Sequence, residues 1–285
     1  MEDDIFSGGQ SGQSGVRLGK LIAQRGVASR RGAEALIESG DVTVNGHVIK
    51  QPGTTVNPNT DHVRVEGRPL PPEPKKVYLV LYKPRGMTTG PDEKDRPSVI
   101  AMLEGMGLKV DPVGRMEFNT EGALILTNDG DLAYQLTRPH LAVPKRYLAK
   151  VYRTPSPKDL AAIERGVNFA EGRSKPAKAR VLEQTDKDNA WVEVTVTESG
   201  QRVVQRILEQ LGHPVSKLRR ESYATISIRG MERGQIRELN GEELARLMDV
   251  AGGVNPKRAG KNWRKPGFAK PKKSNREGGG SRNRD

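Results

Sequence analysis

The sequence predicts an α+β protein in which a small module of two helices and a hairpin precedes a larger, mostly antiparallel domain of mixed strands and helices. Three observations lead to this class. The N-terminal part holds two short amphipathic helical patterns, followed by short strands around an Asn-Gly turn. A proline-rich stretch comes next, and the chain then alternates strand and helix patterns. Its last residues are basic and poor in apolar side chains, which indicates a disordered tail.

The domain boundaries follow from these changes in composition. We expect a disordered 1–15, a first module 16–70, a linker 71–76, a larger domain 77–252 and a disordered basic tail 253–285. The linker prediction depends on the sequence PLPPEP, because proline lacks the backbone N–H group that helices and sheets use.

The first module begins with two helical patterns. In 17–28 apolar residues recur at helical spacing until Gly26 interrupts them. Ser29 is a typical N-cap for a second helix over 30–39, which Gly40 ends. Short strands are expected at 42–44, 48–49 and 62–65, with a hairpin turn after the first of them.

The larger domain opens with an apolar strand from Val77 that Pro84 breaks. Further strands are expected at 123–127, 146–152, 191–197 and 224–228, and helices at 132–136, 157–165, 203–211 and 241–249. The segment WVEVTVT alternates apolar and polar residues, so one face of the sheet is buried there and the other is half-exposed. Hairpin-like spacings favour a mostly antiparallel sheet over a doubly wound, nucleotide-binding one.

Positive charge is concentrated at the end of the chain. Residues 257–285 hold 11 Lys/Arg and 2 Asp/Glu, so they carry +9 of the total +13. A flexible cationic tail binds polyanions by releasing their counterions, with little sequence preference. We therefore expect this tail to contact nucleic acid, and a tail that only increases solubility is the alternative.

Composition also excludes several kinds of site. The chain has no cysteine, its four histidines are dispersed, and it lacks the glycine loop of nucleotide hydrolases. We therefore expect no metal site, no thiol catalysis and no nucleotide hydrolysis. No apolar run reaches the roughly 20 residues that span a bilayer, and the N-terminus lacks a signal-peptide pattern. These features favour a cytoplasmic protein without membrane contact.

Basic residues cluster at the start of the first module. Those that can form one cationic face for an RNA backbone are Arg17, Lys20, Arg25, Arg30 and Arg31. On charge alone, a solvated helical face is the better explanation. The order of elements favours RNA, because 17–70, with VASRRGAEALIESGDVTVNG at its centre, resembles the S-four type RNA-binding domain named after a small-subunit ribosomal protein.

One stretch of the larger domain has the composition of a site. Residues 113–130, VGRMEFNTEGALILTNDG, contain a Gly-Arg turn, a polar segment with Glu117, a buried strand and an Asn-Asp-Gly turn. Acidic residues at the mouth of a buried strand are common in sites and equally common as ordinary turn chemistry.

Three stretches resemble the small-subunit-type family of pseudouridine synthases, which isomerise uridine to pseudouridine in ribosomal RNA. They are YLVLYKPRGMTT at 78–89, VGRMEFNTEGALILTNDGDLAYQLTRP at 113–139 and PKRYLAKV at 144–151. With the first module, the resemblance runs from about Arg17 to Val250. It implies a pseudouridine synthase fold, ribosomal RNA as the partner, and neither cofactor nor metal.

The resemblance also implies roles for three residues. Uracil must be detached from its ribose, turned and rejoined through carbon 5, which requires a carboxylate at the sugar–base junction and an aromatic ring against the extruded uridine. The family uses an Asp in a Gly-Arg-Leu-Asp turn and the Tyr of a Lys-x-Tyr strand. The matching positions here are Glu117 and Tyr147. Arg115 is expected to hold the flipped nucleotide or its phosphate, or to be a surface arginine.

Two positions depart from the family's pattern. Glu117 has one methylene more than Asp, which moves the carboxylate by roughly 1–1.5 Å, and a displacement of about 1 Å can cost about 100-fold in rate. The basic residue that pairs with the family's Asp corresponds to Gln205, which is neutral. Arg202 or Arg206, four residues apart on one helical face, is a candidate to replace that cation.

Three functions remain open at this point. The first is an active pseudouridine synthase on ribosomal RNA, and the second is a catalytically silent RNA-binding relative that acts in ribosome assembly. The third is a generic basic RNA-binding module, which the specific motifs disfavour. We favour the enzyme because the carboxylate and the tyrosine are retained. A monomer is the default expectation, since no sequence pattern indicates an oligomer. Arg219 or Arg220 is expected to contact RNA phosphates or to line the sheet edge.

Overall fold

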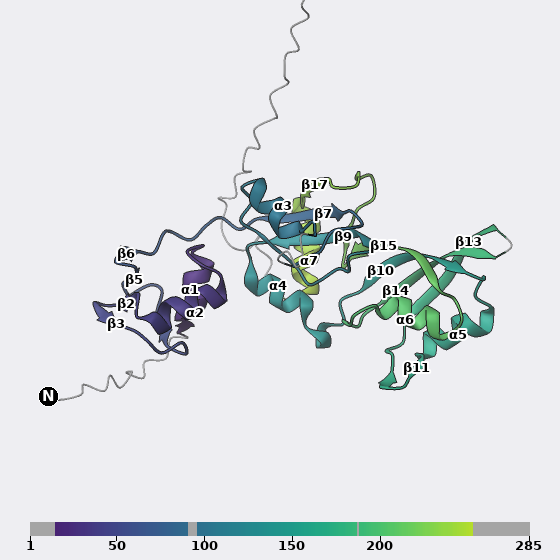
Figure 1. Ribbon diagram of the computed structural model, residues 1–285, viewed down its shortest axis with the longest axis horizontal. Helices are drawn as coiled ribbons and strands as arrows, with labels where there is room; N and C mark the ends of the chain where they lie inside the picture. The colour runs from purple at the N-terminus through teal and green to yellow at the C-terminus, as the bar shows by residue number, and fades with distance from the viewer. Residues whose placement is uncertain (1–14, 91–95, 187, 253–285) are drawn as a thin grey trace, which may run out of the picture.

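The computed structural model describes residues 15–90, 96–186 and 188–252. Within these ranges a small module, purple in Figure 1, precedes a larger domain built on one long sheet. The basic tail predicted at 253–285 and all but Gly15 of the N-terminal segment predicted to be disordered lie outside the described residues.

Two helices of the small module pack over short strands. Helix α1 (Leu18–Gln24) and helix α2 (Arg30–Ser39) share a core with the strands that follow them. As predicted, the hydroxyl of Ser29 caps α2 by accepting the N–H of Gly32 at 3.1 Å, and Gly40 ends the helix with a φ of 85°. Both signals are local, which explains why the sequence predicts the bounds of α2 correctly.

The strands of the small module form two antiparallel sheets. The larger sheet has the order β3 (His47–Val48), β2 (Val42–Val44), β5 (Val63–Val65) and β6 (Arg68–Pro69). The smaller pairs β1 (Val16–Arg17) with β4 (Thr55–Val56). The predicted hairpin turn is present, with Asn45 and Gly46 at positive φ between β2 and β3.

A single sheet organises the larger domain. Its main path runs β13 (Lys178–Asp186), β14 (Asn189–Val196), β10 (Lys145–Tyr152), β15 (Val215–Tyr223), β9 (Thr120–Thr127), β7 (Tyr78–Lys83), β17 (Ile236–Glu238). Short strands β8 (Asp111–Pro112) and β16 (Ile226–Ser227) pair with β9 and β15. Along this path β15 and β9 are parallel and the other neighbours are antiparallel. The predicted α+β class is therefore confirmed.

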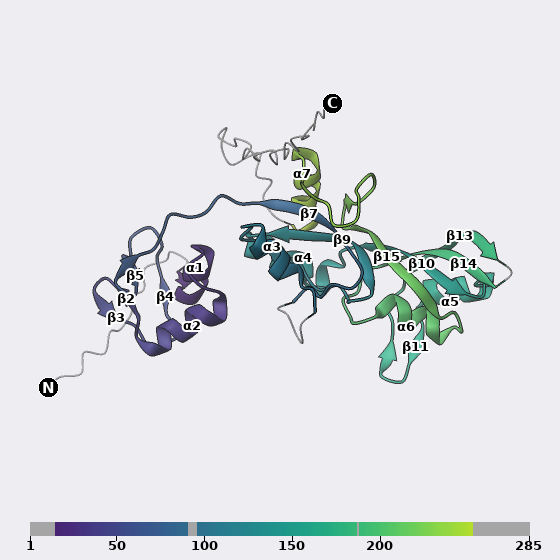
Figure 2. The same ribbon diagram turned by 45° about the horizontal axis from the view of Figure 1, so that its top comes forward.

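Helices cover the sheet at both of its ends. They are α3 (Val99–Gly105), α4 (Gly130–Thr137), α5 (Pro157–Arg165), α6 (Val203–Gln210) and α7 (Gly241–Val250), with a single turn η1 (Pro139–Leu141) and a hairpin of β11 (Asn168–Phe169) and β12 (Gly172–Arg173) between strands. Helices α5 and α6 lie under the part of the sheet farthest from the small module (Figure 2). No helix in the described ranges is long and apolar enough to cross a membrane.

Strands β7 and β9 are buried on both faces. In β7, Val80 joins the core made with α4 and α7, while its neighbours Leu79 and Leu81 join the core made with α3. Strand β14 instead alternates buried and half-buried residues, as predicted from WVEVTVT. The first residue of β9, Thr120, is only 3% exposed and lies three residues after Glu117.

Several elements differ from the prediction. Of the strand expected at 224–228, only β16 is present, because the long strand is β15 and Ala224 turns the chain with a φ of 52° while its N–H donates to the Pro144 carbonyl. Helix α3 and edge strand β13 were not predicted. Both have weak local signals: α3 has seven residues, and β13 carries many polar residues.

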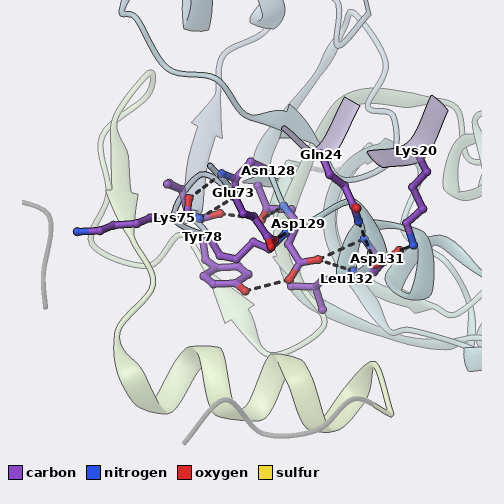
Figure 3. Close-up of polar contacts among 12 residues, drawn as sticks. Lys20, Gln24, Glu73, Lys75, Tyr78, Asn128, Asp129, Asp131 and Leu132 are labelled. Atoms are coloured by element: carbon purple, nitrogen blue, oxygen red, sulfur yellow. Dashed lines mark hydrogen bonds and ion pairs between the residues drawn. The ribbon is translucent and has the colours of Figure 1, made fainter. Parts of the chain in front are cut away.

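A polar contact joins the small module to the larger domain. Nζ of Lys20 lies 2.6 Å from one carboxylate oxygen of Asp131, and Nε2 of Gln24 lies 3.5 Å from the other (Figure 3). Two residues earlier in the chain, Asp129 accepts the hydroxyl of Tyr78 at 3.0 Å. The Asn-Asp-Gly turn singled out from the sequence therefore anchors the first strand of the larger domain, and Asp131, just after this turn in α4, contacts α1.

Candidate active site

A cleft of about 890 Å³ opens beside the ends of the central strands and the start of α6. The residues singled out from the sequence that line it are Arg115, Glu117, Tyr147, Arg202, Gln205 and Arg220. They come from the turn before β9, from β10, from the N-terminus of α6 and from β15. The fold thus gathers positions that are up to about one hundred residues apart along the chain.

Glu117 is held at the N-terminus of α6 by two hydrogen bonds. Its Oε1 accepts the backbone N–H of Arg202 at 2.5 Å, and its Oε2 accepts Nε2 of Gln205 at 2.6 Å. The first N–H groups of a helix have no partner within the helix and carry partial positive charge, so they stabilise a carboxylate. Gln205 therefore orients the acid group without contributing a charge.

The backbone at Arg202 is unusual in a way that serves this contact. Arg202 precedes α6 with a φ of 53°, in the left-handed region that residues other than glycine adopt uncommonly. Such strain persists where the surroundings impose it, and it concentrates at functional sites. Here the conformation accompanies an N–H group that donates to Glu117.

The two guanidinium groups expected near Glu117 point elsewhere. Arg202 pairs with Glu209 at 2.9 Å. Arg206 pairs with Glu171 and lies over the ring of Phe169, 4.5 Å from its centroid. The described contacts of both side chains thus run contrary to the expectation that one of them replaces the family's cation.

Tyr147 and Arg220 face each other across neighbouring strands. Tyr147 on β10 is half-buried and pairs in register with Arg220 on β15. Arg220 is only 2% exposed, and β15 lies between β10 and β9. Arg220 is therefore not a sheet-edge residue, and burial keeps it away from phosphates on the surface. Arg115, by contrast, is exposed at the cleft.

Lys145, which the sequence patterns did not single out, also lines this cleft. Lys145 begins β10, two residues before Tyr147, and is only 8% exposed. Its Nζ lies 3.2 Å from Oγ of Ser199 and 3.2 Å from the Glu198 carbonyl. Burial, followed by the nearby charge of Arg220, lowers the pKa of Lys145 to about 8. The sequence did contain a signal for this residue, because Lys145 lies two positions before Tyr147 in the Lys-x-Tyr stretch.

The basic residues of the small module do not share one role. Lys20 pairs with Asp131, and Arg25 donates to the Pro71 carbonyl at 3.0 Å, so both contact the rest of the protein. The others are exposed: Arg17, Arg30 and Arg31. For metals, no group of three or more acidic or imidazole ligands occurs in the part of the chain that the structure describes.

Two family models match the chain. One, described as RNA pseudouridylate synthase, covers residues 77–210, and the other, the S4 domain, covers residues 16–62. A protein of Bacillus subtilis named ribosomal large subunit pseudouridine synthase B is 40% identical over 237 residues, which is 82% of this chain and 96% of the relative.

Other similar proteins agree with these matches. A protein of Aquifex aeolicus named as an uncharacterized RNA pseudouridine synthase is 39% identical over 239 residues, covering 83% of this chain and 95% of its own length. A crystal structure of a pseudouridylate synthase superposes with a TM-score of 0.57 and 27% identity, over 81% of this chain and 99% of that one.

Proposed function

The chain belongs to the RNA pseudouridylate synthase family and carries an S4 domain, and on this premise we propose that it isomerises one uridine of ribosomal RNA to pseudouridine. The resemblance inferred from the sequence is confirmed by these matches. Similarity to a large-subunit enzyme supports large-subunit RNA as the substrate.

The observation that carries this function is the oriented carboxylate of Glu117 in the same cleft as Tyr147. A uridine extruded from its stack lies with its base against the tyrosine ring and its sugar–base bond toward the carboxylate. Glu117 then acts as nucleophile or base at that junction. Because two hydrogen bonds hold the acid group, little reorganisation is needed when the bond breaks.

The surface residues have supporting roles in this proposal. Arg115, exposed at the cleft, contacts the flipped nucleotide's phosphate, and Arg17, Arg30 and Arg31 contact the RNA backbone from the small module. Domains spanning 16–70 and 77–252, joined by a linker at 71–76, act together as a monomer. Ribosomal RNA as the substrate supports a cytoplasmic location for the protein.

The test compares ribosomal RNA from cells with and without the gene, by chemical mapping of pseudouridine. Loss of one modified position on deletion is expected, and wild-type protein restores it. Glu117→Gln fails to restore it, because the amide is neither a nucleophile nor a base. Glu104→Gln, an exposed glutamate on α3, is the matched control and restores it fully. If every position persists after deletion while ribosomal subunit profiles change, the protein is instead a silent RNA binder.

A further inference from the structure

We infer that Lys145 and Arg220 form a cationic floor that holds the extruded uracil by its carbonyl oxygens and stabilises the negative charge it gains on leaving the ribose. Both residues line the same cleft as Glu117 and Tyr147. Lys145 and Arg220 thus have a catalytic role that neither Glu117 nor Tyr147 supplies, and this role rests on the proposed function.

Arg220 has a buried donor without a protein partner. Its Nε donates to the Ala123 carbonyl at 2.7 Å, and its guanidinium lies over the ring of Tyr223, 5.0 Å from the centroid. Its Nη2 is buried and has no hydrogen-bond partner among the described residues. An unsatisfied charged donor costs free energy, so its retention beside a cleft points to a ligand atom that accepts from it.

Lys145 adds a second buried cation above the same ring. Its Nζ lies 5.6 Å from the centroid of Tyr223, and its printed contacts are carbonyl and hydroxyl oxygens. Neither Lys145 nor Arg220 has an ion pair within the described ranges. Two buried like charges destabilise each other, so this arrangement favours an electron-rich ligand.

The burial of Lys145 and Arg220 in the cleft indicates which part of the nucleotide reaches them. Exposed cations of the cleft such as Arg85 and Arg115 suit a phosphate that stays in contact with water. The floor lies beside Tyr147, because Arg220 is its register partner and Lys145 precedes it by two residues. A base stacked on that ring presents its edge to the floor, and the acceptors on a uracil edge are its two carbonyl oxygens.

The reaction places negative charge on the same oxygens. When the bond between ribose C1′ and uracil N1 breaks, its electron pair stays on uracil and spreads to both carbonyl oxygens. After the ring turns, an electron pair of C5 forms the new bond to C1′, the C5 proton leaves, and N1 takes up a proton. The uracil base is neutral in both the substrate and the product. The two cations therefore stabilise the transition state, in which the base is negatively charged, more than they stabilise the substrate or the product.

Lys145 also predicts a pH dependence. Its pKa of about 8 means that the floor loses one charge as the pH rises through that value. The groups that face it are Arg220 and Tyr223 from β15, Glu198 from the loop before α6, and Lys175 from the loop before β13. Burial raises the pKa of Tyr223 to about 12, so this phenol stays neutral where Lys145 titrates.

The first experiment separates binding from chemistry. Lys145→Met and Arg220→Met are assayed on ribosomal RNA from the deletion strain, with single-turnover rate and RNA affinity measured separately. Each is expected to lower the rate by about 100-fold with affinity changed less than about threefold. Lys150→Met on the same strand and exposed Arg229→Met are the controls and keep the wild-type rate. Full rates in folded Lys145→Met and Arg220→Met overturn the inference.

A second measurement tests the cationic floor even if Arg220→Met does not fold. The wild-type single-turnover rate is expected to fall above a pH of about 8. Lys145→Arg keeps the cation without titrating in this range, so its rate stays level to a pH of at least about 9. An unchanged alkaline limb in Lys145→Arg overturns the cationic floor alone, whereas wild-type protein that forms no pseudouridine overturns the proposed function.

Discussion

Glu117 is longer than the Asp of the family's pattern, and its partner Gln205 is shorter than the family's basic residue and neutral. The family's pattern pairs an Asp with a basic side chain, whereas here the extra methylene of Glu117 closes the distance to the amide of Gln205 at 2.6 Å. The N–H of Arg202 accounts for the other oxygen. Two substitutions that each look damaging from the sequence are therefore complementary in the structure.

This complementarity predicts coupled mutations. Glu117→Asp alone draws the carboxylate back by about 1 Å and is expected to lower the single-turnover rate by about 100-fold. Gln205→Arg introduces a longer, charged partner that reaches an Asp, so the double variant is expected to recover at least about tenfold relative to Glu117→Asp. Effects that simply multiply in the double variant would show that the two side chains act independently.

Tyr147 gives a second prediction at this scale. Tyr147→Ala removes the ring against which the extruded base lies, so turnover is abolished while RNA affinity, measured by filter binding, stays nearly unchanged. Most of the RNA contact is expected from backbone-binding residues elsewhere. Tyr147→Phe is the matched control because it keeps the stacking face. Wild-type turnover in Tyr147→Ala would remove the tyrosine from the site.

Among the elements, the parallel contact of β9 with β15 is the one that assembles the cleft. Gly122 on β9 pairs with Arg220, and a Cβ atom at Gly122 would lie 2.2 Å from the Arg220 carbonyl oxygen. Its φ of 122° is also one that side chains disfavour. Glycine at this position therefore allows the strand after Glu117 to approach the strand that carries Arg220.

Gly122→Ala is expected to separate these strands. The clash involves backbone atoms, so the free energy of unfolding falls by at least about 2 kcal/mol, measured by urea denaturation. Gly105→Ala is the control, since Gly105 ends α3 and a Cβ there meets nothing within 4 Å. Equal stability of the two variants would mean that the strands have room to adjust.

For the whole molecule, a surface ion pair is among the contacts between the small module and the larger domain. The side chains of Lys20 and Asp131 are 33% and 59% exposed, and pairs of this kind contribute about 0–1 kcal/mol. We expect an RNA phosphate to compete with Asp131 for the same ammonium group. This ion pair is weak enough to be exchanged for such a phosphate.

Asp131→Asn tests this exchange. The variant frees Lys20, so the melting temperature hardly changes while RNA affinity rises and the slope of its salt dependence steepens by about 0.7–0.9. Asp249→Asn, an exposed aspartate on α7, removes the same charge away from the junction and is expected to leave the slope unchanged. Identical slopes in both variants would show that Lys20 does not reach phosphate.

Features that arise from neighbouring residues could be predicted from the amino-acid sequence alone. Helix caps at Ser29 and Gly40, the hairpin turn at Asn45 and the alternation in β14 depend on groups a few residues apart, so a local pattern is enough to predict them. The motif around Glu117 and the tyrosine after Lys145 likewise identified the family from short stretches.

Which of these groups come into contact depends instead on the packing of the whole chain. The strand order that sets β15 beside β9 joins segments almost a hundred residues apart, and it makes Arg220 a buried donor beside Tyr147. The same packing turns a backbone N–H of Arg202, rather than its guanidinium, toward Glu117. Burial and donor direction depend on the whole packed chain, which local residue patterns do not encode.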